Sequence, residues 1–215
     1  MTTAVAEHDP AGFLLHNTSW AYYTASLWEL YRQGTRSVRI NFDRGKMEFM
    51  TVSRRHEAIK TAVARLLETY TLELRIRCTG FGNVTCRRED LEKGLEPDEC
   101  YYITTPAPPA DAEELDLGVN PPPDIAIEVD IARSSIPRQP IYAAIGVPEI
   151  WRFDGSRLTP MRLTADRRYE AQARSDVLPD LDFDVFNRFL AQALRDQSRA
   201  VLAFQDWLRS RKTQA

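Results

Sequence analysis

The chain is short of the residues from which several common kinds of site are built. It has three cysteines, Cys78, Cys86 and Cys100, an odd number without a Cys-x-x-Cys pair. This argues against both a disulfide framework and a structural zinc site. It has no apolar run long enough to cross a bilayer, and residues 1–10 lack the basic and then apolar order of a signal peptide. We therefore expect a cytoplasmic protein without a membrane partner.

Lysine is also scarce, so arginine carries most of the positive charge. Only four of the 28 basic residues are lysines, at positions 46, 60, 93 and 212. A net charge of −3 and a sequence pI near 5.7 give the whole molecule no attraction for a polyanion. Binding of nucleic acid would therefore depend on a local patch of arginines.

Helical and strand patterns alternate along the 215 residues, which predicts an α/β fold with one sizeable core. Helices are expected over residues 19–33, 53–74 and 138–146, and one long C-terminal helix over residues 186–208. Strands are expected over residues 38–42, 46–50, 75–78, 84–88, 98–103, 123–130, 149–154 and 157–163. We expect residues 1–18 to be an N-terminal tail, 19–190 the domain, and 191–215 a helical extension of it. The Pro-, Ala- and acid-rich residues 104–123 predict a mobile surface loop.

The strand predicted over residues 123–130 has two chemically opposite faces. Because side chains alternate along a strand, Asp124, Glu128 and Asp130 share one face, and the other face is apolar. Acids at close range repel one another, so a divalent cation among them is the simplest explanation of the crowding. On this interpretation, removing one acid leaves the fold intact or slightly more stable.

A second acidic motif, Glu96-Pro97-Asp98, also precedes an apolar strand. If the two strands are neighbours, Asp98 and Glu128 supply two oxygen ligands for Mg²⁺ or Mn²⁺, with Asp124 and Asp130 as further candidate ligands. Other roles stay open for three of these acids. Asp98 and Asp124 each follow a proline, where acids often only end a loop. Asp130 could instead form a salt bridge with a nearby arginine, either Arg133 or Arg138.

These motifs belong to a larger ordered set: Phe42–Gly45, Met47–Met50, His56, Glu96–Asp98, Pro123–Asp124, Ile127–Val129, Tyr142 and Gly146–Trp151. The set resembles the Uma-type restriction endonuclease family, within the PD-(D/E)XK nuclease superfamily, from about residue 19 to residue 190. The resemblance implies a restriction-endonuclease-like fold, a mixed β-sheet flanked by helices with an acidic site at one edge. It also implies that Asp98 is the first acid, that Glu128 is the second, and that metal-bound water is the nucleophile.

The chain has no lysine at the position where the superfamily signature has one. Two residues after the second acid the chain has Asp130, and the position where family members commonly have lysine, four residues before Tyr142, is Arg138. Arginine can bind phosphate and stabilise the charge of a transition state, but it stays protonated and cannot act as a base. We therefore predict Arg138 as a catalytic residue that stabilises charge, with water activated by the metal alone.

Three more residues are candidates for lining the site. His56 and Glu57 lie in the first turn of a predicted helix, where both also suit the helix terminus. Tyr142 lies one helical turn after Arg138 and faces the same way, either packing or lining the site. The sequence and the resemblance together predict a divalent-metal-dependent nuclease that hydrolyses phosphodiester bonds of nucleic acid, with DNA as the favoured substrate and RNA left open.

Alternative functions remain open at this point. One is a nuclease fold that binds nucleic acid or protein but cleaves weakly, and another is a hydrolase of smaller phosphate esters. A homodimer contact through the C-terminal helix is also open.

Overall fold

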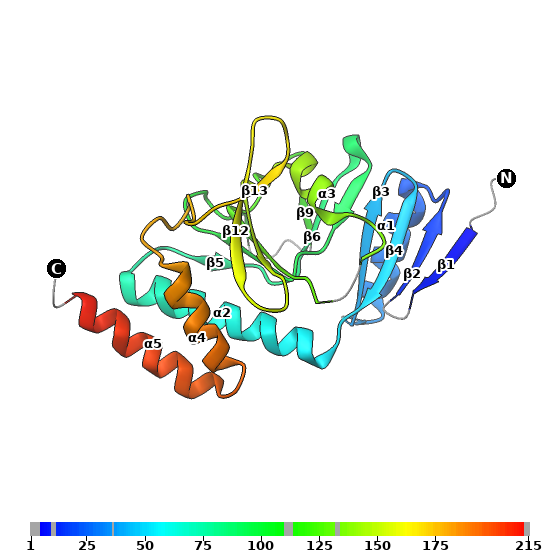
Figure 1. The fold of residues 1–215 in the computed structure, drawn as a ribbon. Coiled ribbons are helices and arrows are strands. Elements are labelled where there is room, and N and C mark those ends of the chain that lie inside the picture. Colours follow the sequence, from blue (N-terminus) through cyan, green and yellow to red (C-terminus); the bar gives the residue numbers. More distant parts are fainter. Residues whose placement is uncertain (1–4, 10–11, 36, 110–113, 132–133, 213–215) are drawn as a thin grey trace.

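The structure is a computed structural model that describes residues 5–9, 12–35, 37–109, 114–131 and 134–212 (Figure 1). Two mixed sheets form its framework. The seven-stranded sheet has the order β1-β2-β4-β3-β7-β6-β9, and the six-stranded sheet has the order β13-β12-β11-β10-β8-β5. The first contains β1 Val5–Asp9, β2 Gly12–His16, β3 Val38–Asp43, β4 Lys46–Thr51, β6 Thr85–Arg88, β7 Lys93–Leu95 and β9 Glu114–Asp116. The second contains β5 Thr79–Gly80, β8 Glu99–Tyr102, β10 Ile125–Val129, β11 Glu149–Phe153, β12 Leu158–Leu163 and β13 Tyr169–Ala171.

Helices flank both sheets, so the predicted fold class is confirmed. They are α1 Trp20–Arg32, α2 Arg54–Leu74, α3 Arg138–Ile145, α4 Phe183–Ala193 and α5 Gln197–Lys212, with a short 3₁₀ turn at Glu89–Leu91. In Figure 1, α2, α4 and α5 lie together, and their apolar side chains share one core with β8, β10 and β11. Helix α3 packs in a second core, and α1 in a third with β3 and β4. Within the described residues, no helix is both long and apolar enough to cross a membrane.

Serine caps fix the starts of α1 and α2 at the predicted residues. The hydroxyl of Ser19 accepts the backbone N–H of Tyr22, and that of Ser53 accepts the backbone N–H of His56. Each bond satisfies a backbone donor that has no partner inside the helix. The second cap places His56 and Glu57 in the first turn of α2.

The central strand β10 has the two faces that its sequence predicts. Ile125, Ile127 and Val129 belong to the core formed with α2, α4 and α5, whereas Ala126 belongs to the core with α3. Glu128 shares the α3 side, as alternation requires. Strand β8 pairs antiparallel with β10, which confirms the predicted neighbourhood of the two acidic motifs.

Several local predictions were wrong. The expected tail over residues 1–18 contains β1 and β2, which pair with each other and extend the sheet next to β4. The strand expected over residues 75–78 is absent, because the C-cap of α2, Arg75, has the left-handed conformation and β5 begins only at Thr79. The expected single C-terminal helix is two helices. Asp196 separates them, since its carboxylate accepts the backbone N–H of Arg199 at the start of α5.

The stretch over residues 104–123 is also more ordered than predicted, apart from residues 110–113, which lie outside the described residues. It contributes β9, which pairs parallel with β6. Leu115 and Leu117 are buried in the core under α3. Strand pairing and these buried apolar side chains together hold the segment against the sheet.

Candidate active site

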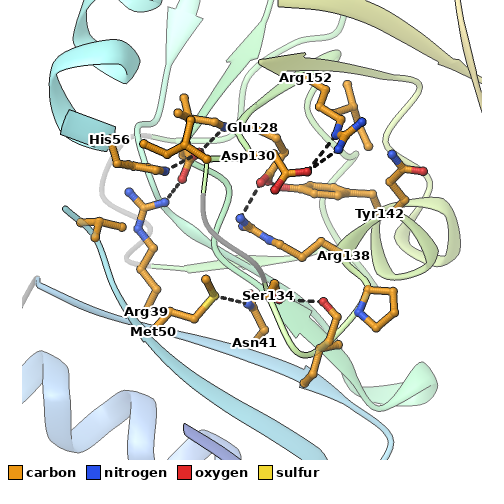
Figure 2. A pocket seen from close by; sticks show the side chains of 18 of the residues that line it. Arg39, Asn41, Met50, His56, Glu128, Asp130, Ser134, Arg138, Tyr142 and Arg152 are labelled. Atoms are coloured by element: carbon orange, nitrogen blue, oxygen red, sulfur yellow. Dashed lines mark hydrogen bonds and ion pairs between the residues drawn. The ribbon is translucent and has the colours of Figure 1, made fainter. Parts of the chain in front are cut away.

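A cavity of about 910 Å³ is lined by residues of both sheets and of the N-terminal ends of α2 and α3 (Figure 2). It brings together six of the eight predicted site residues: His56, Asp98, Glu128, Asp130, Arg138 and Tyr142. The other two, Glu57 and Asp124, are not among the described residues that line it. The catalytic and metal-binding roles of these residues stay a prediction.

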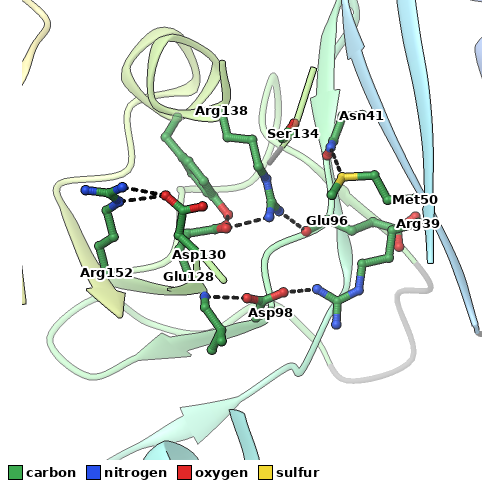
Figure 3. Close-up of polar contacts among 12 residues, drawn as sticks. Arg39, Asn41, Met50, Glu96, Asp98, Glu128, Asp130, Ser134, Arg138 and Arg152 are labelled. Carbon is green, nitrogen blue, oxygen red and sulfur yellow. Dashed lines mark hydrogen bonds and ion pairs between the residues drawn. The ribbon is translucent and has the colours of Figure 1, made fainter. Parts of the chain in front are cut away.

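Asp98 is completely buried immediately before β8, and both of its carboxylate oxygens have partners (Figure 3). Its Oδ1 forms an ion pair with the guanidinium group of Arg39 from β3. Its Oδ2 accepts the backbone N–H of Val129 at 2.6 Å, and Nε2 of His56 lies 3.0 Å from the same oxygen. Asp98 is thus held against β10, close to Glu128.

His56 and Glu57 support this arrangement from α2. Burial, together with the charge of Arg39, lowers the pKa of His56 to about 4, so His56 is neutral near pH 7. Glu57 Oε1 lies 3.3 Å from both Nδ1 of His56 and Nη2 of Arg39. Glu57 therefore does not line the cavity itself but contacts two residues that do, and it also forms an ion pair with Lys60 at 2.9 Å.

Glu128 faces α3 and contacts both of the residues expected on that helix. Nη1 of Arg138 lies 2.5 Å from Oε2 of Glu128, and the hydroxyl of Tyr142 donates to Oε1. Burial raises the pKa of Glu128, although the charge of Arg138 opposes this. Burial and the charge of Glu128 raise the pKa of Tyr142, which keeps its hydroxyl protonated as a donor. Arg138 also donates from Nη2 to the carbonyl of Glu96 (Figure 3).

Asp130 lies at a more exposed edge of the cavity. Its Oδ2 accepts two hydrogen bonds from Arg152 of β11, at 3.0 and 2.5 Å. Of the two partners weighed from sequence, Arg138 pairs with Glu128 instead, and Arg133 lies outside the described residues. Asp130 is thus a salt-bridge partner that also borders the site.

Asp124 supports the chain after β8. Its carboxylate accepts five hydrogen bonds of 2.6 to 3.0 Å, from the backbone N–H groups of Ile103, Thr104 and Thr105 and from both threonine hydroxyls. Burial opposes ionisation, but these hydrogen bonds outweigh it and lower the pKa of Asp124. We therefore assign Asp124 to this turn rather than to the ion.

The variant Asp124→Ala tests that assignment. We expect it to lower the free energy of unfolding by about 3 kcal/mol, because several donors lose a charged acceptor. Binding of Mn²⁺ by the folded variant should be unchanged. Urea denaturation and calorimetry would measure the two effects, with the exposed Asp206→Ala on α5 as control. Loss of Mn²⁺ binding at unchanged stability would return Asp124 to the metal site.

Sequence reasoning missed three buried residues around the cavity. Arg39 holds Asp98, and the carbonyl of Glu96 holds Arg138. Glu48 accepts hydrogen bonds from Asn41 at 2.9 Å, from the Ser134 hydroxyl at 2.6 Å and from the Ser135 backbone at 2.5 Å. A signal was available for Arg39, since it alternates with apolar residues on β3.

Three acids at the cavity each form an ion pair with an arginine. The expectation that these acids repel one another and need a cation among them is therefore corrected. The three pairs are Asp98 with Arg39, Glu128 with Arg138, and Asp130 with Arg152. Removing a buried acid would leave a buried arginine without its partner, which costs stability. The expectation that such variants stay as stable as the wild type is therefore replaced by an expected loss.

The donor set nevertheless fits a hard divalent ion. A carboxylate oxygen can accept two contacts, and Oδ1 of Asp98 and both oxygens of Glu128 have one each. Mg²⁺ is commonly held by one or two carboxylates, with waters and substrate phosphate as its other ligands. The described residues contain no group of three or more His, Cys, Asp or Glu side chains that could hold a metal. Asp98 and Glu128 stay the two predicted ligands, and both line this cavity.

A comparison with protein families identifies the class to which this α/β chain belongs. Residues 28–195 match the Uma2 family, described as "Putative restriction endonuclease", and the chain belongs to this family. The resemblance predicted from the motifs is thereby confirmed. A search of curated proteins gave no match.

One similar solved structure is described as a putative nuclease belonging to DUF820 from Anabaena variabilis ATCC 29413. Its sequence is 17% identical to this chain, and its TM-score is 0.47. The match covers 75% of this chain and 90% of that one.

Proposed function

We propose that this protein hydrolyses phosphodiester bonds of nucleic acid, with DNA as the substrate, using Mg²⁺ or Mn²⁺ held by Asp98 and Glu128. The observation that carries the proposal is the meeting of these two acids, from adjacent strands, in one cavity of about 910 Å³ that also contains Arg138. Membership of the Uma2 family supports the same reaction class.

Each residue has a role that follows from its contacts. A bound divalent ion would polarise the phosphate and lower the pKa of water. His56 and the Val129 backbone orient Asp98, and Tyr142 orients Glu128 through its hydrogen bond. Asp130 borders the cavity and would adjust its charge.

Arg138 is suited to stabilise the charge that develops on the phosphate. Its guanidinium lies in the cavity beside Glu128, and its Nε is buried without a hydrogen-bond partner among the described residues. A fixed donor aimed at developing negative charge is worth more in a dry site than in water. Arginine remains protonated, so this role needs no proton transfer.

Substitution of Arg138 tests this role. Arg138→Ala should lower the rate of plasmid cleavage by about 10²-fold or more, as expected for the loss of one preorganised charge. Arg138→Lys keeps the charge and should preserve or raise cleavage. Rates in Mg²⁺ and in Mn²⁺ would be compared with the wild type.

The matched control is Arg157→Ala, which removes an arginine from the exposed pair with Asp184, outside the residues that line the cavity, and should change the rate little. Equal rates for wild type, Arg138→Lys and Arg138→Ala would exclude a catalytic Arg138. Circular dichroism would establish that each variant is folded.

A second candidate is a nuclease fold that binds nucleic acid or protein but cleaves weakly. The pairing of each cavity acid with an arginine favours it, because the buried charges are already balanced without an ion. Binding of DNA without cleavage, by wild type and by all Arg138 variants in Mg²⁺ and Mn²⁺, would select this second function.

A further inference from the structure

Glu48 is a buried acid of β4 that the proposed hydrolysis does not use. It is 3% exposed and is not among the described residues that line the cavity of the candidate active site. In the register of β3 and β4, Glu48 lies opposite Asn41, so both side chains point to the face of the sheet that borders the cavity. A buried carboxylate is costly unless it is hydrogen-bonded, so its partners indicate what it does.

The carboxylate of Glu48 joins parts of the chain that are far apart in the sequence. Its Oε2 accepts Nδ2 of Asn41 at 2.9 Å and the hydroxyl of Ser134 at 2.6 Å, and its Oε1 accepts the backbone N–H of Ser135 at 2.5 Å. Ser134 and Ser135 come shortly before α3, at 86 and 87 residues from Glu48. Hydrogen bonds to a charged acceptor are stronger than neutral ones. Glu48 thus fastens the chain that enters α3 to the seven-stranded sheet.

Helix α3 depends on such an anchor, because its start has no cap of its own. Its N-cap residue is Pro137, and no side chain there makes a capping hydrogen bond. In many helices a Ser, Thr, Asp or Asn side chain at this position fixes the first turn. The first turn of α3 also contains no acid. The path of the chain into α3 is therefore set by the contacts of Glu48 and by Ile136, which is buried in the core with α3.

Arg138 is the first residue of α3, so its position depends on this anchor. Only Ile136 and Pro137 lie between Ser135 and Arg138. Pro137 has a fixed φ, which makes this link stiff. A displacement of Ser135 would therefore move Arg138 as well.

We propose that Glu48 is a positioning residue that holds Arg138 in place by anchoring the start of α3. This inference deepens the proposed hydrolysis and rests on it. A displacement of about 1 Å in a group that acts on the transition state can lower a rate by about 10²-fold. A residue that does not line the cavity can therefore control kcat.

Glu48→Gln tests the proposal. Glutamine has one acceptor oxygen and one donor nitrogen, so it cannot accept from both Asn41 and Ser135. We expect kcat for DNA cleavage to fall by about tenfold or more, with little change in KM, because the contact that is lost serves the transition state. Ser134→Ala removes only one of the three hydrogen bonds and should lower kcat less, which keeps the test open if Glu48→Gln does not fold.

The matched control is Glu149→Gln on β11. Glu149 is also a buried acid, 2% exposed, and it accepts the side chain of Trp151 at 2.5 Å and the backbone N–H of Asp176 at 2.8 Å. It is not among the described residues that line the cavity, and neither partner belongs to the chain that enters α3. Its replacement should lower stability in urea denaturation and leave kcat unchanged.

An Arg138→Ala background separates positioning from a general structural role. If Glu48 acts through Arg138, Glu48→Gln should cause no further loss of kcat once Arg138 is replaced. Hydrogen exchange measured by mass spectrometry gives a second readout that needs no activity. Exchange over residues 134–142 should become faster in Glu48→Gln and stay unchanged in Glu149→Gln.

Three results would each overturn the proposal. The first is an unchanged kcat in folded Glu48→Gln and Ser134→Ala. The second is a loss of kcat from Glu48→Gln that is as large in the Arg138→Ala background as in the wild type. The third is unchanged exchange over residues 134–142. If the wild type cleaves no nucleic acid, the proposed hydrolysis fails, and the exchange data decide whether Glu48 anchors the start of α3.

Discussion

Glu128→Gln is expected to lower cleavage of DNA by about 10³-fold, because the side chain keeps its shape and loses the charge that would hold the ion. The hydrogen bond from Tyr142 can persist, since the amide oxygen of glutamine also accepts. Binding of Mn²⁺ should weaken in parallel. Cleavage rates over a range of Mn²⁺ concentrations, together with calorimetry, would measure both effects.

The control for this variant is Asp206→Asn, which neutralises an exposed acid on α5 and should leave both measurements unchanged. If Glu128→Gln binds Mn²⁺ and cleaves as well as the wild type, Glu128 is not a metal ligand. A loss of cleavage at unchanged Mn²⁺ affinity would point to a different site for the ion.

The second large effect is expected on stability, at Arg39. This side chain is 4% exposed and neutralises the completely buried Asp98, so Arg39→Met leaves a buried carboxylate without its ion pair. Breaking a buried pair from one side typically costs about 3–5 kcal/mol. Urea denaturation should show a loss of this size in the free energy of unfolding.

A double-mutant cycle separates the ion pair from simple packing. In Arg39→Met with Asp98→Asn both charges are absent, so the combined loss should be smaller than the sum of the two single losses by about 2 kcal/mol. Asparagine can still accept the backbone N–H of Val129. Strict additivity of the losses would show that Arg39 and Asp98 do not stabilise the fold as a pair.

Local physical signals were enough to predict the elements that build the site. Period-2 alternation separated Glu128 from Ile125, Ile127 and Val129, and the structure has these two faces. Helical spacing placed Arg138 and Tyr142 on one face of α3, where both contact Glu128. The cap at Ser53 set the start of α2. Each of these signals is carried by residues close together in the sequence.

What the sequence did not reveal depends on contacts between distant segments. Arg39 is 59 residues from Asp98, and nothing local to β3 indicates which acid it meets. Asp124 looks like a site acid until the turn at Ile103 to Thr105 is placed beside it. The strand β2 became part of the sheet only through pairing with β4. The break between α4 and α5 lies in a stretch whose apolar pattern continues through it, and only the cap at Asp196 marks it.

The central claim is that Asp98 and Glu128 together hold a divalent ion, and anomalous diffraction from a crystal soaked in Mn²⁺ tests it most directly. We predict one anomalous peak between the two carboxylates, in the cavity that also contains Arg138. Absence of a peak there at saturating Mn²⁺, with Arg39 still on Asp98 and Arg138 still on Glu128, would contradict the claim.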